Sequence, residues 1–245
     1  MASKKWKKRL VFLLLLIISI GGAGFAYIKI NTYHPTKQAI TASVAAEEDN
    51  HTLFFKGKEE NPVLIFYQGA FVDNQSYSIW AQEVAAAGYS VYLLKQPLNL
   101  AVLGMNDAEK LIKKEKIDKY LVGGHSLGGV MASRFAHNHL EDEGFQGVFL
   151  LASYPDKKGS LAYSDKPVLS ITGTEDGVLN KENYEEGKVY LPKNASYQVI
   201  QGGNHAGFGS YGQQKGDNPP EINNEEQQRE LANMLIQWLS QNFKA

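Results

Sequence analysis

The residues best suited to chemistry in this sequence are a serine, an aspartate and a histidine that lie in or beside glycine-rich loops. Ser126 is the centre of a Gly-x-Ser-x-Gly motif, and Asp176 and His205 follow it in that order. A serine hydroxyl becomes a good nucleophile when a base removes its proton, and the base needs an acid that orients it. The three residues therefore indicate acyl transfer through a covalent serine intermediate.

Ser126 lies where a strand is predicted to turn into a helix. The apolar residues 120–122 predict a buried strand, and the small and apolar residues 130–137 predict a helix. Such a turn forces the serine into a strained backbone conformation, and glycines on both sides let the strand and the helix approach. A bare Gly-x-Ser-x-Gly pattern also suits a structural turn, so the flanking elements and the downstream partners are what favour a nucleophile.

Asp176 and His205 each follow a predicted strand. Residues 168–172 predict a strand that ends shortly before Asp176, and residues 197–200 predict the last strand, shortly before His205. The carboxyl ends of parallel strands are where ligand sites form in open α/β sheets. Glu175, in the same turn, is the alternative acid, and an aspartate before a glycine is also typical of a turn that caps main-chain amides.

The other histidines are less suited to act as the base. His34 and His51 lie outside the predicted strand ends, and His137 and His139 close a helix, where they interact with its carbonyl end. His125 precedes the serine, and adjacent side chains diverge. We expect His125 to shape the pocket, which leaves His205 as the base, against the alternative that it is an exposed loop histidine.

Acyl transfer also needs main-chain N–H groups that stabilise the developing oxyanion. The residue after the nucleophile usually supplies one donor, which is Leu127 here. The loop after an early central strand supplies the second. Residues 62–67 predict that strand, and Ala70 is the expected donor, with Phe71 as the alternative.

The first thirty residues are predicted to be separate from the catalytic domain. Five cations cluster within residues 4–9, and residues 10–28 carry no charge, which is long enough for a helix to cross a bilayer. We expect residues 1–30 to be a cytoplasmic basic segment and an uncleaved anchor in the cell membrane, with the domain outside. Residues 24–26 also fit a small-x-small cleavage site, so a secreted protein is the alternative.

The composition narrows the partners of the remaining chain. Lysine and arginine number 25 against 26 aspartates and glutamates, so no nucleic-acid partner is indicated. There is no cysteine, no His-Glu-x-x-His motif and no Cys/His cluster, so neither a metal nor another cofactor is expected. Residues 31–39 are polar and contain a His-Pro pair, which indicates a tether. Residues 40–245 form one predicted domain.

Strands and helices alternate through that domain, which predicts a mostly parallel central sheet with helices on both faces. The predicted strands are residues 53–56, 62–67, 89–94, 119–122, 147–151, 168–172 and 197–200. The predicted helices are residues 77–87, 107–116, 130–137, 181–191 and 231–243. Only about a dozen residues connect the strand ending near Ser153 to the one beginning near Pro167, so a cap domain is not expected there.

Together these residues resemble the α/β-hydrolase family, over about residues 53–243. The resemblance rests on the serine motif, the Asp176 turn and the His205 loop. Residues 67–70, 88–89 and 203–209 are similar to compact members without a cap that are often labelled dienelactone-hydrolase-like. Dienelactone hydrolases proper use a cysteine nucleophile, which this chain lacks, and the His-Gly-Gly-Gly run of many lipases is also missing.

The resemblance implies an α/β-hydrolase fold without a cap domain and a serine hydrolase with a Ser126, His205 and Asp176 triad. The expected substrate is a small-molecule carboxylic ester, cleaved through an acyl-enzyme. An acyltransferase or amidase on the same triad is one alternative. A catalytically silent surface-binding module is another, because a fold alone does not establish activity.

Overall fold

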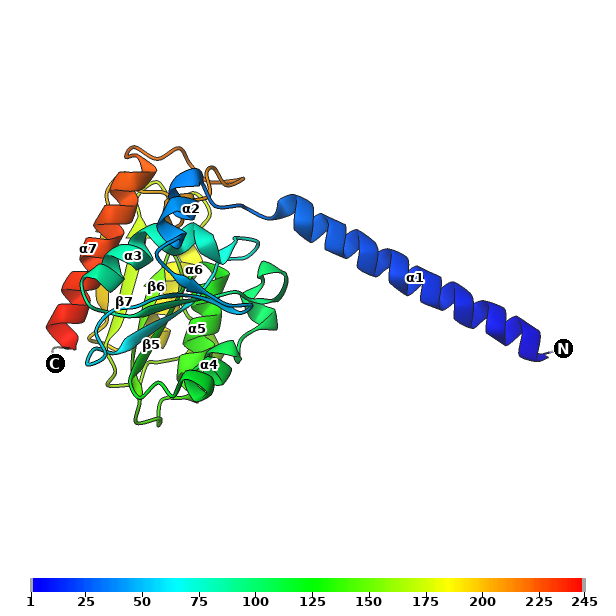
Figure 1. The fold of residues 1–245 in the computed structure, drawn as a ribbon, viewed down its shortest axis with the longest axis horizontal. Helices are drawn as coiled ribbons and strands as arrows, with labels where there is room; N and C mark the ends of the chain where they lie inside the picture. The colour runs from blue at the N-terminus through cyan, green and yellow to red at the C-terminus, as the bar shows by residue number, and fades with distance from the viewer. Residues whose placement is uncertain (1, 244–245) are drawn as a thin grey trace. The chain divides into compact units, whose positions relative to one another are not determined.

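The computed structural model describes residues 2–243, and the chain divides into two units, one ending at Thr32 and the other beginning at Tyr33. The first unit is one long helix, α1 (Ala2–Asn31), drawn in blue in Figure 1. From Lys8 to Asn31 this helix is long and apolar enough to cross a membrane, a test that a signal sequence also passes.

The second unit is built on an eight-stranded sheet with the strand order β1-β2-β4-β3-β5-β6-β7-β8. The strands are β1 (Glu47–Glu48), β2 (Thr52–Phe55), β3 (Val63–Tyr67), β4 (Val91–Leu94), β5 (Tyr120–His125), β6 (Phe145–Leu151), β7 (Val168–Gly173) and β8 (Ser196–Ile200). The pairs β1–β2 and β2–β4 are antiparallel, and every pair from β4 to β8 is parallel. The predicted mostly parallel sheet is confirmed.

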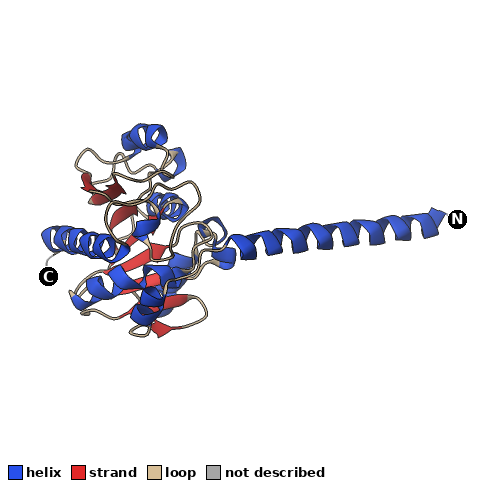
Figure 2. Ribbon diagram, turned by 90° about the horizontal axis from the view of Figure 1, so that it is seen from above, coloured by secondary structure: helices blue, strands red, loops and turns tan. Residues whose placement is uncertain are grey.

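The helices of this unit are α2 (Lys37–Ser43), α3 (Ser78–Ala86), α4 (Asp107–Glu115), α5 (Leu127–Asn138), α6 (Lys181–Gly187) and α7 (Asn224–Asn242). They cover both faces of the sheet (Figure 2). Each face has its own core, because successive residues of a strand point to opposite sides. Phe66 of β3 packs in a core with Trp80 of α3 and Leu235 of α7. Its neighbour Ile65 packs in the other core with Phe135 of α5. Helices on both faces are thereby confirmed.

The last helix begins seven residues before its predicted start. Asn223 caps it, because its side-chain oxygen accepts a hydrogen bond from the main-chain nitrogen of Glu226 at 2.9 Å. The first two turns are largely polar, so apolar periodicity alone marks only the part from Leu231 onward. The predicted helix over residues 181–191 is shorter in the structure, ending at Gly187 with a 3-10 turn after it.

Residues 33–36, within the expected tether, lie in the second unit and are hydrogen-bonded to its loops. The main-chain nitrogen of Tyr33 donates to the oxygen of Phe71 at 2.7 Å, and the nitrogen of Asp73 donates to the oxygen of Tyr33 at 3.0 Å. Tyr33 forms a parallel β-bridge with Val72. At the other end of the segment, the nitrogen of Thr36 donates to the main-chain oxygen of Ser210 at 2.8 Å.

The connection from β6 to β7 is short. Residues 152–167 contain one 3-10 turn, Lys157–Gly159, as the length of that connection predicts. The fold expected from the sequence, without a cap domain, is confirmed.

Candidate active site

Ser126 stands at the sharp turn between β5 and α5, and its backbone is strained. Its φ of 53° and ψ of −123° lie in a region that non-glycine residues rarely enter, at a cost on the order of 1–3 kcal/mol. Two glycines make the turn feasible: a Cβ at Gly124 would lie 2.3 Å from the carbonyl carbon of Gly128, and one at Gly128 would lie 2.2 Å from the oxygen of Tyr67. The local sequence thus produces the strained serine.

Hydrogen bonds with the end of β6 and with a residue just after it hold this turn. The main-chain nitrogen of Ser126 donates to the oxygen of Leu151 at 3.0 Å, and the hydroxyl of Ser153 donates to the oxygen of Ser126 at 2.7 Å. Ser126 itself is partly exposed. A strained, anchored and accessible serine has the geometry that nucleophilic attack requires.

Asp176 and His205 form a buried hydrogen-bonded pair. The Nδ1 atom of His205 lies 2.8 Å from Oδ2 of Asp176, and both side chains are 1% exposed. The other carboxylate oxygen, Oδ1, accepts hydrogen bonds from the main-chain nitrogens of Val178 at 2.9 Å and Leu179 at 2.7 Å. The aspartate therefore caps its turn and orients the histidine at once. His205 thus pairs with Asp176 and not with the alternative acid, Glu175. The main-chain nitrogen of Glu175 donates to the main-chain oxygen of Gly203.

The pairing fixes the tautomer of His205. A carboxylate only accepts hydrogen bonds, so Nδ1 carries the proton and Nε2 is an acceptor in the neutral ring. This Nε2 atom is buried and has no hydrogen-bond partner among residues 2–243. The ring of His125, the residue before Ser126, lies 4.5 Å from the ring of His205, so the serine turn and the histidine loop are neighbours.

His125 is a neutral residue of the core. Its Nδ1 atom lies 3.0 Å from the hydroxyl of Tyr77, and that hydroxyl accepts a hydrogen bond from the main-chain nitrogen of Gly69 at 2.9 Å. Burial, and then the neighbouring His205, hold the pKa of His125 well below its ordinary value, while burial raises the pKa of Tyr77. Tyr77 therefore keeps its proton, and donating it to Nδ1 of His125 gives the Tyr77 hydroxyl both a donor and an acceptor partner.

The remaining histidines lie in other settings. His34 lies 2.7 Å from a carboxylate oxygen of Asp73. His139 lies 2.7 Å from the oxygen of Phe135 near the end of α5, so it interacts with the carbonyl end of that helix as expected.

Among residues 69–71, in the loop after β3, one main-chain donor is uncommitted. The nitrogen of Gly69 donates to Tyr77 at 2.9 Å, and the nitrogen of Phe71 donates to the oxygen of Asn99 at 2.8 Å. The nitrogen of Ala70 has no acceptor within the described part of the chain. The nitrogen of Leu127, in the first turn of α5, has none either. This geometry favours Ala70 over Phe71 as the second donor.

Two residues that contact the site carry no signal in the sequence. Tyr77 was expected only as the start of a helix, and Asp217 lies in an irregular segment after the histidine loop. Tyr77 and Asp217 each accept a hydrogen bond from a main-chain nitrogen atom. Because every residue except proline has such a nitrogen, no residue pattern marks the partner.

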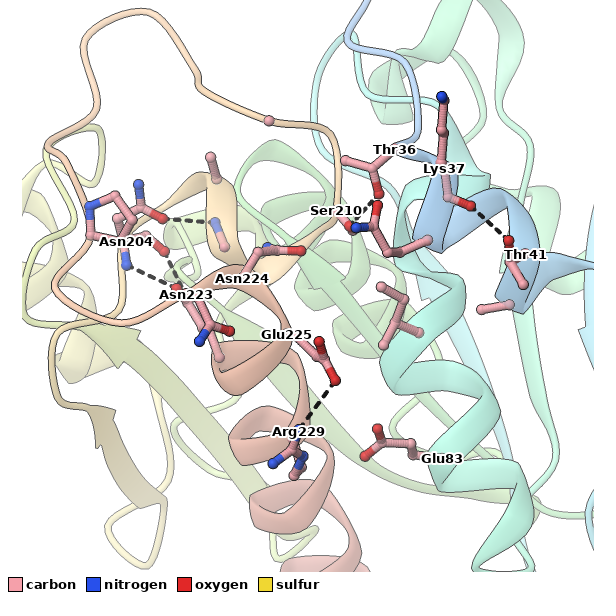
Figure 3. A pocket seen from close by; sticks show the side chains of 18 of the residues that line it. Thr36, Lys37, Thr41, Glu83, Asn204, Ser210, Asn223, Asn224, Glu225 and Arg229 are labelled. Atoms are coloured by element: carbon pink, nitrogen blue, oxygen red, sulfur yellow. Dashed lines mark hydrogen bonds and ion pairs between the residues drawn. The ribbon is translucent and has the colours of Figure 1, made fainter.

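A cavity of about 1010 Å³ borders the histidine loop but does not contain the chemical groups described above. Figure 3 shows its labelled walls, which include Thr36 and Lys37 at α2, Asn204 of the loop, and Glu225 and Arg229 of α7. Ser126, Asp176 and His205 do not line it. The described residues also hold no cluster of three or more His, Asp or Glu side chains suited to a metal.

Comparisons with known proteins agree with this architecture. The sequence profile of the alpha/beta hydrolase family matches residues 63–229. No curated protein matches the chain.

Several solved structures are similar to this fold. One is an alpha/beta hydrolase from the metagenome of lagoon sediments at Mar Chica, Morocco, with a TM-score of 0.60 and 15% identity, covering 80% of this chain and 98% of its own. A monoacylglycerol lipase of Paleococcus ferrophilus has a TM-score of 0.59 and 15% identity, with coverages of 80% and 100%. An esterase of Thermogutta terrifontis has a TM-score of 0.59 and 14% identity, with coverages of 79% and 94%.

Proposed function

Because the chain belongs to the alpha/beta hydrolase family, we propose that it is a serine hydrolase that cleaves carboxylic esters of small molecules. The observation that carries the proposal is the buried 2.8 Å hydrogen bond between Asp176 and His205, beside the strained turn of Ser126. An acid that orients a base next to a nucleophile is the arrangement that acyl transfer needs. Similar structures include an esterase and a monoacylglycerol lipase, which supports esters as substrates.

The reaction has two halves. Ser126 Oγ attacks the acyl carbonyl carbon while its proton moves to Nε2 of His205, and the N–H groups of Ala70 and Leu127 stabilise the oxyanion. The tetrahedral intermediate collapses, the carbon–oxygen bond to the alcohol breaks, and His205 returns the proton to the leaving alcohol. Water, deprotonated by the same nitrogen, then cleaves the acyl-enzyme and restores the serine. Asp176 holds the ring and stabilises its charged form throughout.

We propose that the long helix α1 anchors this activity in the cell membrane. Its apolar part is long enough to span, and the five cations before it keep the N-terminus in the cytoplasm, so the catalytic domain lies outside. A secreted protein cleaved near residues 24–26 is the alternative. The mass of the mature protein distinguishes the two, since cleavage removes the entire basic segment.

A fluorophosphonate probe tests the proposal directly. The probe should label the wild-type protein and the control Ser240→Ala, whose hydroxyl lies on α7 and donates to the main-chain oxygen of Gln237, but not Ser126→Ala. Hydrolysis of p-nitrophenyl acetate should fall by about 10⁴-fold or more in Ser126→Ala, as removal of a triad member does elsewhere. Labelling that persists in that variant, or a kcat above a tenth of the wild-type value, would refute the assignment.

A further inference from the structure

Asp217 lies in the irregular segment between the histidine loop and α7, and its carboxylate binds several main-chain N–H groups. Oδ1 accepts hydrogen bonds from the nitrogens of Gly177 at 3.0 Å, His205 at 3.3 Å and Asn218 at 3.0 Å. Oδ2 accepts one from the nitrogen of Ala206 at 2.8 Å. One carboxylate therefore joins the acid turn after β7 to the histidine loop after β8.

The bonded amides flank the proposed catalytic pair. Gly177 follows Asp176 directly, and His205 is the proposed base itself. The side chains of Asp176 and His205 meet at 2.8 Å, so the separation of their two backbones decides the length of that bond. Hydrogen bonds from N–H groups to a charged oxygen are stronger than those between neutral groups, so the carboxylate resists any change in this separation.

The segment that carries Asp217 is itself tied to the fold. The side-chain nitrogen of Asn204 donates to the main-chain oxygen of Asn218 at 2.9 Å. The main-chain nitrogen of Lys215 donates to the hydroxyl of Tyr33 at 3.2 Å, and that of Glu221 donates to the oxygen of Gly202 at 2.8 Å. Asp217 therefore lies in a segment that is hydrogen-bonded to the rest of the domain on both sides of it.

We propose that Asp217 is a positioning residue for the hydrolysis: it holds the Asp176 turn and the His205 loop at the spacing that orients the base. This inference rests on the proposed function. The carboxylate also contributes a negative charge near the imidazolium that forms during the reaction. The carboxylate of Asp176 and the ring of His125 also lie against His205, so Asp217 adds a second anion to this surrounding.

Two substitutions test the proposal in the full-length protein. Asp217→Asn keeps one acceptor oxygen and loses the charge, whereas Asp217→Ala loses every acceptor. With p-nitrophenyl acetate, kcat should fall by about tenfold in the asparagine variant and about a hundredfold in the alanine variant, with KM little changed. The control is Glu221→Gln, which removes a charge from the same segment at an exposed side chain and should keep the wild-type kcat.

A pH profile separates positioning from a general loss of structure. Removal of the Asp217 charge favours the neutral imidazole, so the acidic limb of kcat/KM should move to lower pH in Asp217→Asn and stay in place in Glu221→Gln. Asp217→Asn and Glu221→Gln should each unfold in one cooperative transition in urea, as we expect for the wild type. Wild-type kcat together with an unmoved limb in Asp217→Asn would overturn the proposal.

A second readout does not depend on turnover. The proton on Nδ1 of His205, shared with Asp176, is observable by NMR, and its signal should broaden or vanish in both Asp217 variants and persist in Glu221→Gln. A signal unchanged in Asp217→Ala would overturn the positioning role even if the substrate were unknown. A wild-type protein that neither hydrolyses esters nor reacts with the fluorophosphonate would refute the proposed function instead.

Discussion

The hydroxyl of Tyr77 lies 3.0 Å from Nδ1 of His125 and joins two loops of the candidate site. It also accepts a hydrogen bond from the nitrogen of Gly69, one residue before the proposed oxyanion donor Ala70. His125 directly precedes Ser126 in the sequence. One buried hydroxyl thus sets the position of the proposed oxyanion donor relative to the proposed nucleophile.

Replacement of Tyr77 by phenylalanine tests this link. The change leaves the nitrogen of Gly69 and the ring of His125 buried without their partner, which should lower the free energy of unfolding by about 2 kcal/mol. Ester kcat should also fall, because the Ala70 donor loses its support. Urea unfolding and steady-state kinetics measure the two effects, with the fully exposed Tyr163→Phe as control. Wild-type stability and kcat in Tyr77→Phe would contradict the link.

The buried, neutral His125 predicts a loss of stability in acid. Its pKa is held well below the ordinary value in the folded protein. As the pH falls below the usual histidine range, His125 therefore takes up a proton only in the unfolded chain. Unfolding is therefore favoured there, by about 1.4 kcal/mol per pH unit for one proton.

The variant His125→Gln isolates this contribution, because glutamine has an acceptor for Tyr77 and no proton to gain. Its free energy of unfolding, measured with urea between pH 7 and pH 5, should depend less steeply on pH than that of the wild type. Equal slopes in the two proteins would show that His125 is not held neutral by the fold.

Truncation at two points tests how far the catalytic unit extends toward the N-terminus. Deletion of residues 1–31 removes α1 and keeps the hydrogen bonds of Tyr33 to Phe71 and Asp73. Deletion of residues 1–35 removes those bonds from the loop that carries Ala70. We expect wild-type kcat for the shorter deletion and a fall of about tenfold for the longer one, since a displaced donor loses transition-state stabilisation. Equal activity of both products would contradict this expectation.

The ion pair between Arg134 of α5 and Asp156 predicts a second pH effect. The arginine lowers the pKa of Asp156, so the pair contributes stability above the ordinary carboxyl pKa, and this is lost as the pH falls through the lowered value. The side chains are 27% and 37% exposed, and solvent screening limits the contribution to about 1 kcal/mol. Asp156→Asn should lose it at pH 7 and match the wild type in strong acid, as measured by chemical denaturation.

The short connection between β6 and β7 predicts a preference for short acyl chains. With only one 3-10 turn in residues 152–167, little apolar wall is available there, and each methylene left in water forgoes about 0.8 kcal/mol. Across p-nitrophenyl esters, kcat/KM should peak between acetate and butyrate. A steady rise to the dodecanoate would show that another segment forms an acyl-binding wall and would favour a lipase.

Much of the fold could be predicted because it follows from local patterns in the sequence. Continuous apolar runs marked β3 and β7, and glycines placed the turn at Ser126. The predicted start of α7 was wrong by two turns, because polar residues and the Asn223 cap, not apolar periodicity, define the start of this helix. The packing of residues 33–36 on the domain also had no local signal, because main-chain hydrogen bonds to Phe71 and Ser210 fix it.

The sequence by itself determined which residues were candidates for the chemistry: a serine on a strand-to-helix turn, and an aspartate and a histidine at the ends of parallel strands. Tertiary structure decided how they meet. It paired His205 with Asp176 and not with Glu175, committed the nitrogen of Phe71 to Asn99, and brought Asp217 to the amides around that pair. The physical reason is that residue type fixes what a group can do, whereas these partners are distant in sequence and are chosen by the path of the backbone.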